Sequence, residues 1–173
     1  RVLRAWVRAH GAAPLPATVL QQLQQELLDA PSDRQAQVRW QDHAIQQWRG
    51  HAYLLPALLP ALPAGWQAAW DGRAPLPLPD GGQLRLLGCE AFDRPLQVRA
   101  RQGGERILLP GRTHSHALKD CLQREHLAPW RRAQLPLLFD GGQLLAAADV
   151  VVSAPLQAWL QDHDAQLQWR PGG

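Results

Sequence analysis

Hydrophobic positions in the first third of the chain predict two helices followed by strands. Apolar residues at helical spacing predict a short helix over residues 2–10, which Gly11 ends. The same spacing predicts a longer amphipathic helix over residues 17–29. Apolar and polar residues then alternate over residues 36–40, as in a half-buried strand, and a second strand is expected near residues 52–55.

A cluster of prolines predicts where the chain divides. The six prolines of this cluster are Pro56, Pro60, Pro63, Pro75, Pro77 and Pro79. Such a density disfavours long regular elements and indicates a connection between two domains, with a boundary between residues 62 and 94. We therefore expect an α+β chain, with a helix-rich first domain (1–78) and a small mixed sheet-and-helix C-terminal domain (79–173).

Two segments place Asp-Gly-Gly between apolar runs. They read LPLPDGGQL (residues 76–84) and LPLLFDGGQL (residues 135–144). Glycine adopts positive φ at no steric cost, so each segment predicts a β-hairpin. The similarity also allows a duplicated unit, but the match is short and we favour two independent hairpins.

Positive charge is concentrated in the second half of the chain. Residues 94–132 contain nine Lys or Arg and three Asp or Glu, a local charge of +6, whereas the whole chain is +3 and the remainder is therefore −3. A basic segment in a nearly neutral chain indicates a surface that binds a polyanion, and nucleic acid is the first candidate. The alternative is a solvated basic face without a partner.

Within this segment, a strand and a helix start predict phosphate contacts. Alternation over residues 96–101 places Arg99 and Arg101 on the same face of a strand. Ser115 is a suitable N-cap for a helix over residues 116–126, whose free amides favour an anion. Alternatively, surface ion pairs hold these side chains: Arg99 with Glu105 or Glu125, and Lys119 with Asp120 or Glu125.

Several classes of site are not indicated. The sequence has no P-loop, GxGxxG, GxSxG or HExxH motif, and the isolated His114 and His116 lack a third metal ligand. Cys89 and Cys121 show no CxxC pattern, so we expect buried free thiols and a reducing cytoplasm. No apolar run approaches the ~18 residues of a membrane span.

The tryptophans are interpreted as core residues rather than ligand contacts. Trp6, Trp40 and Trp48 lie in apolar patterns, and Trp130 follows Pro129 in the basic segment. Trp130 could also stack on a base. A core anchor is the more common role for a tryptophan in such a position.

Three stretches in the second half carry a resemblance to a known family. They read VRARQGGERI (98–107), GRTHSHALKDCLQ (111–123) and APWRRAQLPLLFDGGQLLAA (128–147). Together they resemble the C-terminal domain of bacterial tRNA(Ile)-lysidine synthases. The stretches LRAWVRAHG (3–11) and QWRGHAYLL (47–55) are similar to the substrate-binding domain of the same enzymes. Because the chain begins at Arg1 and contains no Met, we expect it to be part of a longer protein.

The resemblance implies a function. Enzymes of this family use ATP to adenylylate the wobble cytidine of a tRNA(Ile) with a CAU anticodon, and lysine then displaces AMP to give lysidine. Their ATP site, with Mg, lies in an N-terminal domain marked by a Ser-Gly-Gly-x-Asp-Ser loop, which is absent from this sequence. The resemblance therefore implies a tRNA-recognition region with no cofactor of its own and no catalytic residue. It leaves the oligomeric state open.

By match to the family's motifs, seven residues are candidates for tRNA contacts. They are Arg99, Arg101, Arg106, Arg112, Ser115, Lys119 and Arg132. The sequence departs from the family's pattern at Gln134, and at Gln46 and Gln47, where basic residues are expected. Two other functions remain open: a non-catalytic module that binds an acidic protein, and a general RNA-binding domain.

Overall fold

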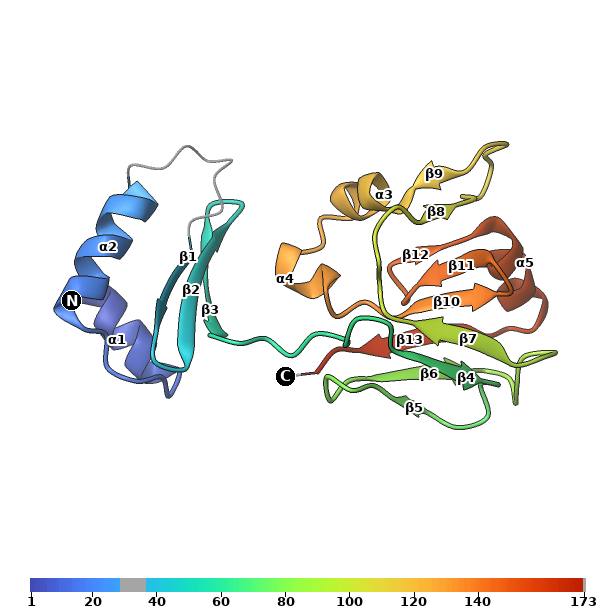
Figure 1. Ribbon diagram of the computed structural model, residues 1–173, viewed down its shortest axis with the longest axis horizontal. Coiled ribbons are helices and arrows are strands. Elements are labelled where there is room, and N and C mark those ends of the chain that lie inside the picture. Colours follow the sequence, from blue (N-terminus) through green and yellow to red (C-terminus); the bar gives the residue numbers. More distant parts are fainter. Residues whose placement is uncertain (29–36, 173) are drawn as a thin grey trace. The chain divides into compact units, whose positions relative to one another are not determined.

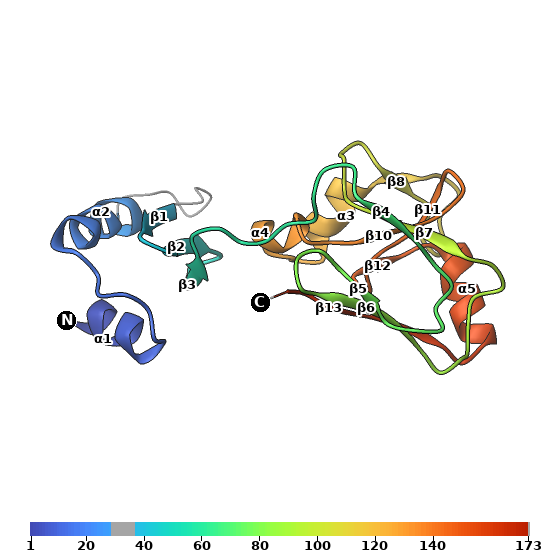
Figure 2. The same cartoon turned by 60° about the horizontal axis from the view of Figure 1, so that its bottom comes forward.

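The computed structural model describes residues 1–28 and 37–172, which form two compact units. The first unit comprises Arg1–Leu59 and the second Pro60–Gly173. Figures 1 and 2 show that the first unit combines helices with one sheet, and that the second is built mainly from strands. The expected α+β class is therefore confirmed. Each unit has its own hydrophobic core.

The first unit packs two helices against a three-stranded antiparallel sheet. Its elements are α1 (Val2–Ala9), α2 (Ala17–Leu28), β1 (Gln37–Trp40), β2 (His43–Trp48) and β3 (His51–Pro56). Val7 of α1, Leu23 of α2 and Ile45 of β2 are buried together in its core. The Trp40 indole Nε1–H also donates a hydrogen bond to the Ala13 carbonyl oxygen, at 3.2 Å.

Both predicted helices and both predicted strands of this unit are confirmed, with Asp29 and Ala36 outside the described residues. The sequence did not reveal β2. Ala44, Ile45 and Gln46 of this central strand are buried in succession, so side chains on both of its faces are covered. The alternation that identifies a half-buried strand is therefore missing there.

The second unit contains a five-stranded antiparallel sheet and a smaller three-stranded one. In spatial order the larger sheet contains β12 (Val151–Val152), β11 (Gln143–Ala147), β10 (Leu137–Asp140), β7 (Leu96–Arg99) and β4 (Gln67–Trp70). The smaller sheet contains β13 (Gln166–Arg170), β6 (Gln83–Leu87) and β5 (Leu76–Pro77). Buried side chains of both sheets, including Val98, Leu138, Leu84 and Leu167, belong to one core.

Short elements complete the second unit. They are the paired strands β8 (Arg106–Ile107) and β9 (His116–Ala117), and the helices α3 (Leu118–Arg124), α4 (Pro129–Arg132) and α5 (Ala154–Asp162). Ser153 caps α5, because its Oγ accepts a hydrogen bond from the Leu156 amide at 3.4 Å. No helix in the described parts of the chain is long and apolar enough to cross a membrane.

The units divide earlier in the chain than the expected boundary between residues 62 and 94. Within the expected 1–78 domain, β4 pairs with β7 and β5 pairs with β6, so both strands belong to the second unit. Three of the six prolines, Pro75, Pro77 and Pro79, therefore lie in or beside a strand of the second unit instead of forming a connection between domains. Pro77 lies in β5 at the edge of its sheet, where a missing N–H is tolerated.

Both Asp-Gly-Gly segments form antiparallel hairpins, as predicted. The first joins β5 to β6 through residues 78–82, and the second joins β10 to β11 through Gly141 and Gly142. Gly141 has a φ of +57°, as a two-residue hairpin turn requires. The hairpins differ in loop length and lie in different sheets, which supports two independent hairpins.

The cysteines and tryptophans lie partly as predicted. Both thiols are free. Cys121 is buried and Cys89 is half-buried, and burial raises the pKa of each thiol above its ordinary value. Trp40 is buried, whereas Trp6, Trp48 and Trp130 are only half-buried.

Candidate nucleic-acid interface

The predicted alternation along β7 is confirmed and orients Arg99 away from the core. Leu96 and Val98 are buried, while Gln97 is exposed and Arg99 is half-buried on the opposite face. The Arg99 guanidinium carbon lies 4.6 Å from the ring centroid of Phe139, on the neighbouring strand β10. Its Nε donates to Gln97 Oε1 at 2.9 Å. The aromatic ring, this amide and the Gly141 carbonyl oxygen hold the guanidinium, and no carboxylate of the described residues pairs with it.

Arg101 and Arg132 border one open groove of about 520 Å³ in the second unit. Arg101 follows β7, whereas Arg132 ends the short helix α4, so residues distant in sequence meet here. The Nε of Arg132 donates to the Leu127 carbonyl oxygen at 3.1 Å, and this hydrogen bond orients its guanidinium group. Small residues, including Ala61, Ala64 and Gly103, form other walls of the groove, which gives room for a ligand.

The two arginines lie close enough to affect each other. Burial lowers the pKa of Arg132 below its ordinary value, and the positive charge of Arg101 lowers it further. Among the residues that the structure describes, one carboxylate compensates: Arg101 Nε lies 3.7 Å from Glu105 Oε2, with the two side chains 21% and 10% exposed. Neither of these two atoms makes a hydrogen bond within the described residues. A bound anion would relieve the repulsion between the guanidinium groups.

The predicted helix cap at Ser115 is wrong. Residues 116–117 form β9 instead, because they pair with Ile107 and Arg106 of β8. Helix α3 starts only at Leu118, with Ala117 at its N-cap and no side-chain cap. The Leu118 amide donates to the Glu105 carbonyl oxygen at 2.9 Å and is therefore already satisfied. A seven-residue helix of this kind provides no anion site at its start.

Ser115 instead holds Arg106. The Arg106 Nε donates to Ser115 Oγ at 3.0 Å, and one of its terminal nitrogens donates to the Ser115 carbonyl oxygen. Both residues are exposed and lie in the β8–β9 hairpin. Arg112, in the loop of this hairpin, and Lys119, in α3, are also exposed. Across residues 1–28 and 37–172, neither side chain makes a hydrogen bond or an ion pair.

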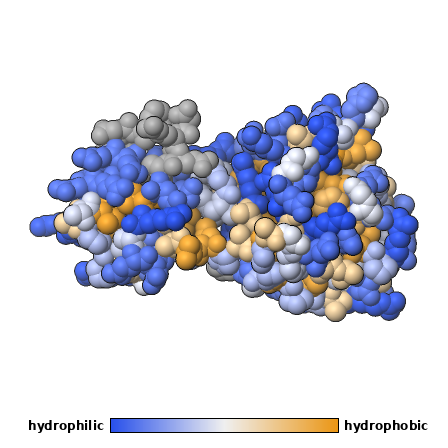
Figure 3. All heavy atoms as spheres, viewed as in Figure 1, coloured by the Kyte–Doolittle hydropathy of each residue, from blue (hydrophilic) through white to orange (hydrophobic). Residues whose placement is uncertain are grey.

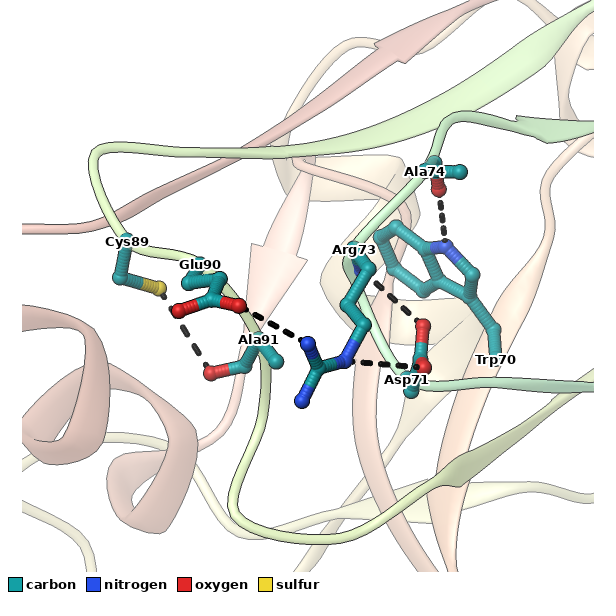
Figure 4. Close-up of polar contacts among 7 residues, drawn as sticks. All are labelled: Trp70, Asp71, Arg73, Ala74, Cys89, Glu90 and Ala91. Atoms are coloured by element: carbon teal, nitrogen blue, oxygen red, sulfur yellow. Dashed lines mark hydrogen bonds and ion pairs between the residues drawn. The ribbon is translucent and has the colours of Figure 1, made fainter.

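The ion pairs considered for Arg99 and Lys119 are therefore not formed among the described residues. Figure 4 shows what such a pairing looks like elsewhere in the same unit. The guanidinium of Arg73 lies between two carboxylates, with Nη1 2.8 Å from Glu90 Oε1 and Nε 3.5 Å from Asp71 Oδ2. Arg94 is likewise paired, with Asp140. The candidate residues differ, since only Arg101 has a carboxylate neighbour in the part of the chain that the structure describes.

The structure thus brings the seven candidates together only in part. Arg101 and Arg132 share the groove, Arg106 and Ser115 share the hairpin, and Arg99 lies over Phe139. The supporting contact from Phe139 was not foreseen, because the pairing of β7 with β10 is not visible in either segment alone. Among the described residues, no group of three or more His, Cys, Asp or Glu side chains could hold a metal ion.

One departure from the family's pattern has a structural explanation. Gln134, where a basic residue was expected, is fully buried. Its Nε2 donates to the Pro60 carbonyl oxygen at 2.9 Å, and its Oε1 accepts from Arg131 Nη1 at 2.9 Å. A neutral side chain that both donates and accepts suits this position. The residue contributes to the fold of the second unit rather than to a charged surface.

Comparison with known proteins identifies both parts of the chain. The family model of the TilS substrate binding domain matches residues 1–53, and that of the TilS substrate C-terminal domain matches residues 96–169. A solved structure described as "Crystal structure of TILS C-terminal domain" aligns with 62% of this chain and 99% of its own. Its sequence identity is 20% and its TM-score 0.43, which is too low a similarity to support the fold.

Curated relatives agree with the family models. The chain is 55% identical to a tRNA(Ile)-lysidine synthase of Xanthomonas campestris pv. campestris over 98% of the chain and 39% of that relative. The corresponding identity is 53% for Xanthomonas axonopodis pv. citri and 49% for Xylella fastidiosa, again over 98% of the chain. The chain spans 39–40% of the length of these relatives. It belongs to the tRNA(Ile)-lysidine synthase family, whose substrate-binding and C-terminal domains it carries.

Proposed function

We propose that the two units bind tRNA(Ile) for an ATP-dependent ligase that converts the wobble cytidine of its CAU anticodon to lysidine. The relatives named tRNA(Ile)-lysidine synthase support the reaction. The observation that carries the binding role is the pair Arg101 and Arg132 at one open groove. Among the described residues a single carboxylate lies near them: Glu105 Oε2 is 3.7 Å from Arg101 Nε, and Glu105 Oε1 accepts hydrogen bonds from the Gln102 and Gly103 amides. A phosphate group is the ligand that this arrangement fits best.

Phosphate contacts of this kind position an RNA without reading its sequence. Arginine matches the geometry of phosphate oxygens with its planar fork of N–H donors, and the groove holds two such groups. Arg106, Arg112 and Lys119 provide exposed charge in and beside the β8–β9 hairpin. In this proposal they add affinity that depends on salt, while shape and a few base contacts provide selectivity.

The chemical step belongs to a part of the enzyme that these two units do not supply. ATP, with Mg, and lysine would be used at a site marked by a Ser-Gly-Gly-x-Asp-Ser loop, which these 173 residues do not contain. We expect the 173-residue chain to bind tRNA and to be inactive alone. We place the enzyme in the cytoplasm, where reduced thiols such as Cys89 and Cys121 are usual.

The main alternative is a module that binds an acidic protein. Figure 3 shows hydrophilic residues over most of one face, with apolar residues exposed in several separate groups. Large hydrophobic side chains that the structure shows exposed are Val2, Leu58 and Leu87. Single exposed hydrophobic side chains are common on protein surfaces, so these three do not by themselves favour a protein interface.

A filter-binding titration of the chain with tRNA(Ile) over a salt series tests the proposal. We expect binding that weakens linearly with the logarithm of the salt concentration, because phosphate contacts release counterions. An unrelated tRNA at equal salt should bind more weakly. Equal affinity for both tRNAs would indicate a general RNA-binding domain. Undetectable binding at low salt would favour the protein-interaction module.

Lys119 offers a test of a single phosphate contact. Because its ammonium is exposed and unpaired among the described residues, Lys119→Ala should leave the fold intact and weaken tRNA binding. The slope of log affinity against log salt should fall by about 0.7–0.9, the value for one lost phosphate contact. Circular dichroism checks the fold. An unchanged affinity with an unchanged salt slope would show that Lys119 does not touch the RNA.

A further inference from the structure

A second concave site lies in the second unit, formed by residues other than the basic candidates. It has a volume of about 370 Å³ and lies between α5, the β10–β11 hairpin and the segment that leads into β7. Its walls are largely apolar, formed by Phe92, Leu96, Leu145, Leu156 and Trp159. All five except Trp159 are buried, so the walls belong to the rigid core. A pocket of this size and lining is typical of small-molecule sites.

Aromatic rings at one side of this pocket are held in fixed orientations. The ring centroids of Phe92 and Trp159 lie 5.0 Å apart, and the Trp159 ring stacks on His163 at 4.1 Å. The Trp159 indole Nε1–H donates to Asp93 Oδ2 at 2.9 Å. Because Trp159 lines the pocket, the part of its indole that these contacts leave accessible can meet a planar ring without first losing side-chain freedom.

The polar groups at the rim are mainly acceptors. Asp93, Asp140, Gln143 and Arg94 border the pocket. Arg94 pairs with Asp140 Oδ2. Asp140 Oδ1 makes no hydrogen bond to the described residues and is therefore available as an acceptor. The rim carries a net negative charge, because it has the two carboxylates of Asp93 and Asp140 and the single guanidinium of Arg94. This charge disfavours binding of a phosphate. The pocket therefore differs in chemistry from the groove at Arg101 and Arg132.

We propose that this pocket takes an unpaired nucleobase that carries an exocyclic amino group, presented by the bound RNA. The planar base would lie on the apolar wall beside Trp159, and its amino group would donate to Asp140. Aspartate is a usual acceptor for the amino group of cytosine, and proteins that bind single-stranded RNA stack its bases on aromatic side chains. The proposal deepens the tRNA-binding function and rests on it.

Cytidine and uridine form a suitable pair of probes, because they differ only on one edge of the ring: the amino group at C4 of cytidine is a carbonyl oxygen in uridine, and N3 carries a hydrogen only in uridine. As nucleosides, they also carry no phosphate that could bind the basic groove. The readout is the indole Nε1–H signal of Trp159 in an NMR spectrum of the 173-residue chain, assigned by its loss in Trp159→Phe. We expect cytidine to shift this signal at millimolar concentration and uridine to bind about tenfold more weakly.

An Asp140→Asn variant separates recognition from a structural effect. If Asp140 accepts from the base, the variant loses most of the preference for cytidine over uridine, whereas a damaged pocket would bind both more weakly in equal proportion. Asp71→Asn, which changes a carboxylate that does not line the pocket, should leave both affinities unchanged.

Three outcomes would overturn the proposal. They are a Trp159 signal that cytidine does not shift, equal binding of cytidine and uridine, and a shift caused only by a simple diamine, which would make the pocket a cation site. If tRNA still binds with the expected salt dependence in any of these cases, the proposed tRNA-binding function stands without the base pocket. If cytidine binds as expected but tRNA does not, the tRNA-binding function fails.

Discussion

Replacing both Arg101 and Arg132 with glutamine should lower the affinity of the chain for tRNA(Ile) by about 100-fold at low salt. A hydrogen bond to a charged group contributes about 1.5–3 kcal/mol, so two lost guanidinium–phosphate contacts account for a change of at least this size. The slope of log affinity against log salt should fall by about 1.4–1.8, the value for two phosphates. Filter binding of labelled tRNA over a salt series measures both quantities.

Arg73→Gln is the matched control for this double variant. It also removes a guanidinium from the second unit, but that group is already paired with Asp71 and Glu90 (Figure 4). We expect its tRNA affinity to change little, because two carboxylates neutralise Arg73, whereas Arg101 has one carboxylate at 3.7 Å and Arg132 has none among the described residues. Equal losses in Arg73→Gln and in either single variant, Arg101→Gln or Arg132→Gln, would mean that only net charge matters. The groove would then have no special role.

Gly88→Ala should destabilise the second unit strongly. Gly88 has a φ of +89°, and an added Cβ would lie 2.2 Å from the Asp164 carbonyl oxygen. Left-handed backbone costs a residue with a Cβ about 1–2 kcal/mol, and overpacking against a fixed neighbour costs about 1–3 kcal/mol more. We expect the free energy of unfolding to fall by about 3–4 kcal/mol, measured by urea denaturation.

Gly111→Ala separates the two contributions. Gly111 has a φ of +70°, but an added Cβ would meet no atom within 4 Å. This variant should therefore lose only the backbone contribution of about 1–2 kcal/mol. A Gly88→Ala variant no less stable than Gly111→Ala would show that the loop at Gly88 moves away from Asp164 at little cost.

Local sequence signals were reliable where one segment determines its own structure. The helical spacing of residues 2–10 and 17–29 corresponds to α1 and α2. Both Asp-Gly-Gly turns form hairpins, because positive φ and flanking apolar strands are properties of the segment itself. The alternation over residues 96–101 also correctly predicted which side chains of β7 are buried.

Signals failed where pairing with another strand competes with the preference of a single segment. Ser115 is a good helix cap in isolation, but pairing of residues 116–117 with β8 holds them in a strand and delays the start of α3. The prolines near residue 75 indicated a connection between domains, yet β4 and β5 pair with strands of the second unit. In both cases hydrogen bonds to a strand from another segment decided the outcome.

The sequence by itself determined the α+β class, the periodic helices, the hairpin turns, the concentration of positive charge and the resemblance to the family. The tertiary structure decided that Arg101 and Arg132 share a groove, that Phe139 lies beneath Arg99, and that apolar walls around Trp159 enclose a pocket. Charge and periodicity belong to individual residues and short segments, so they can be read along the chain. Which side chains meet depends on strand pairing and core packing between distant segments, which no single segment specifies.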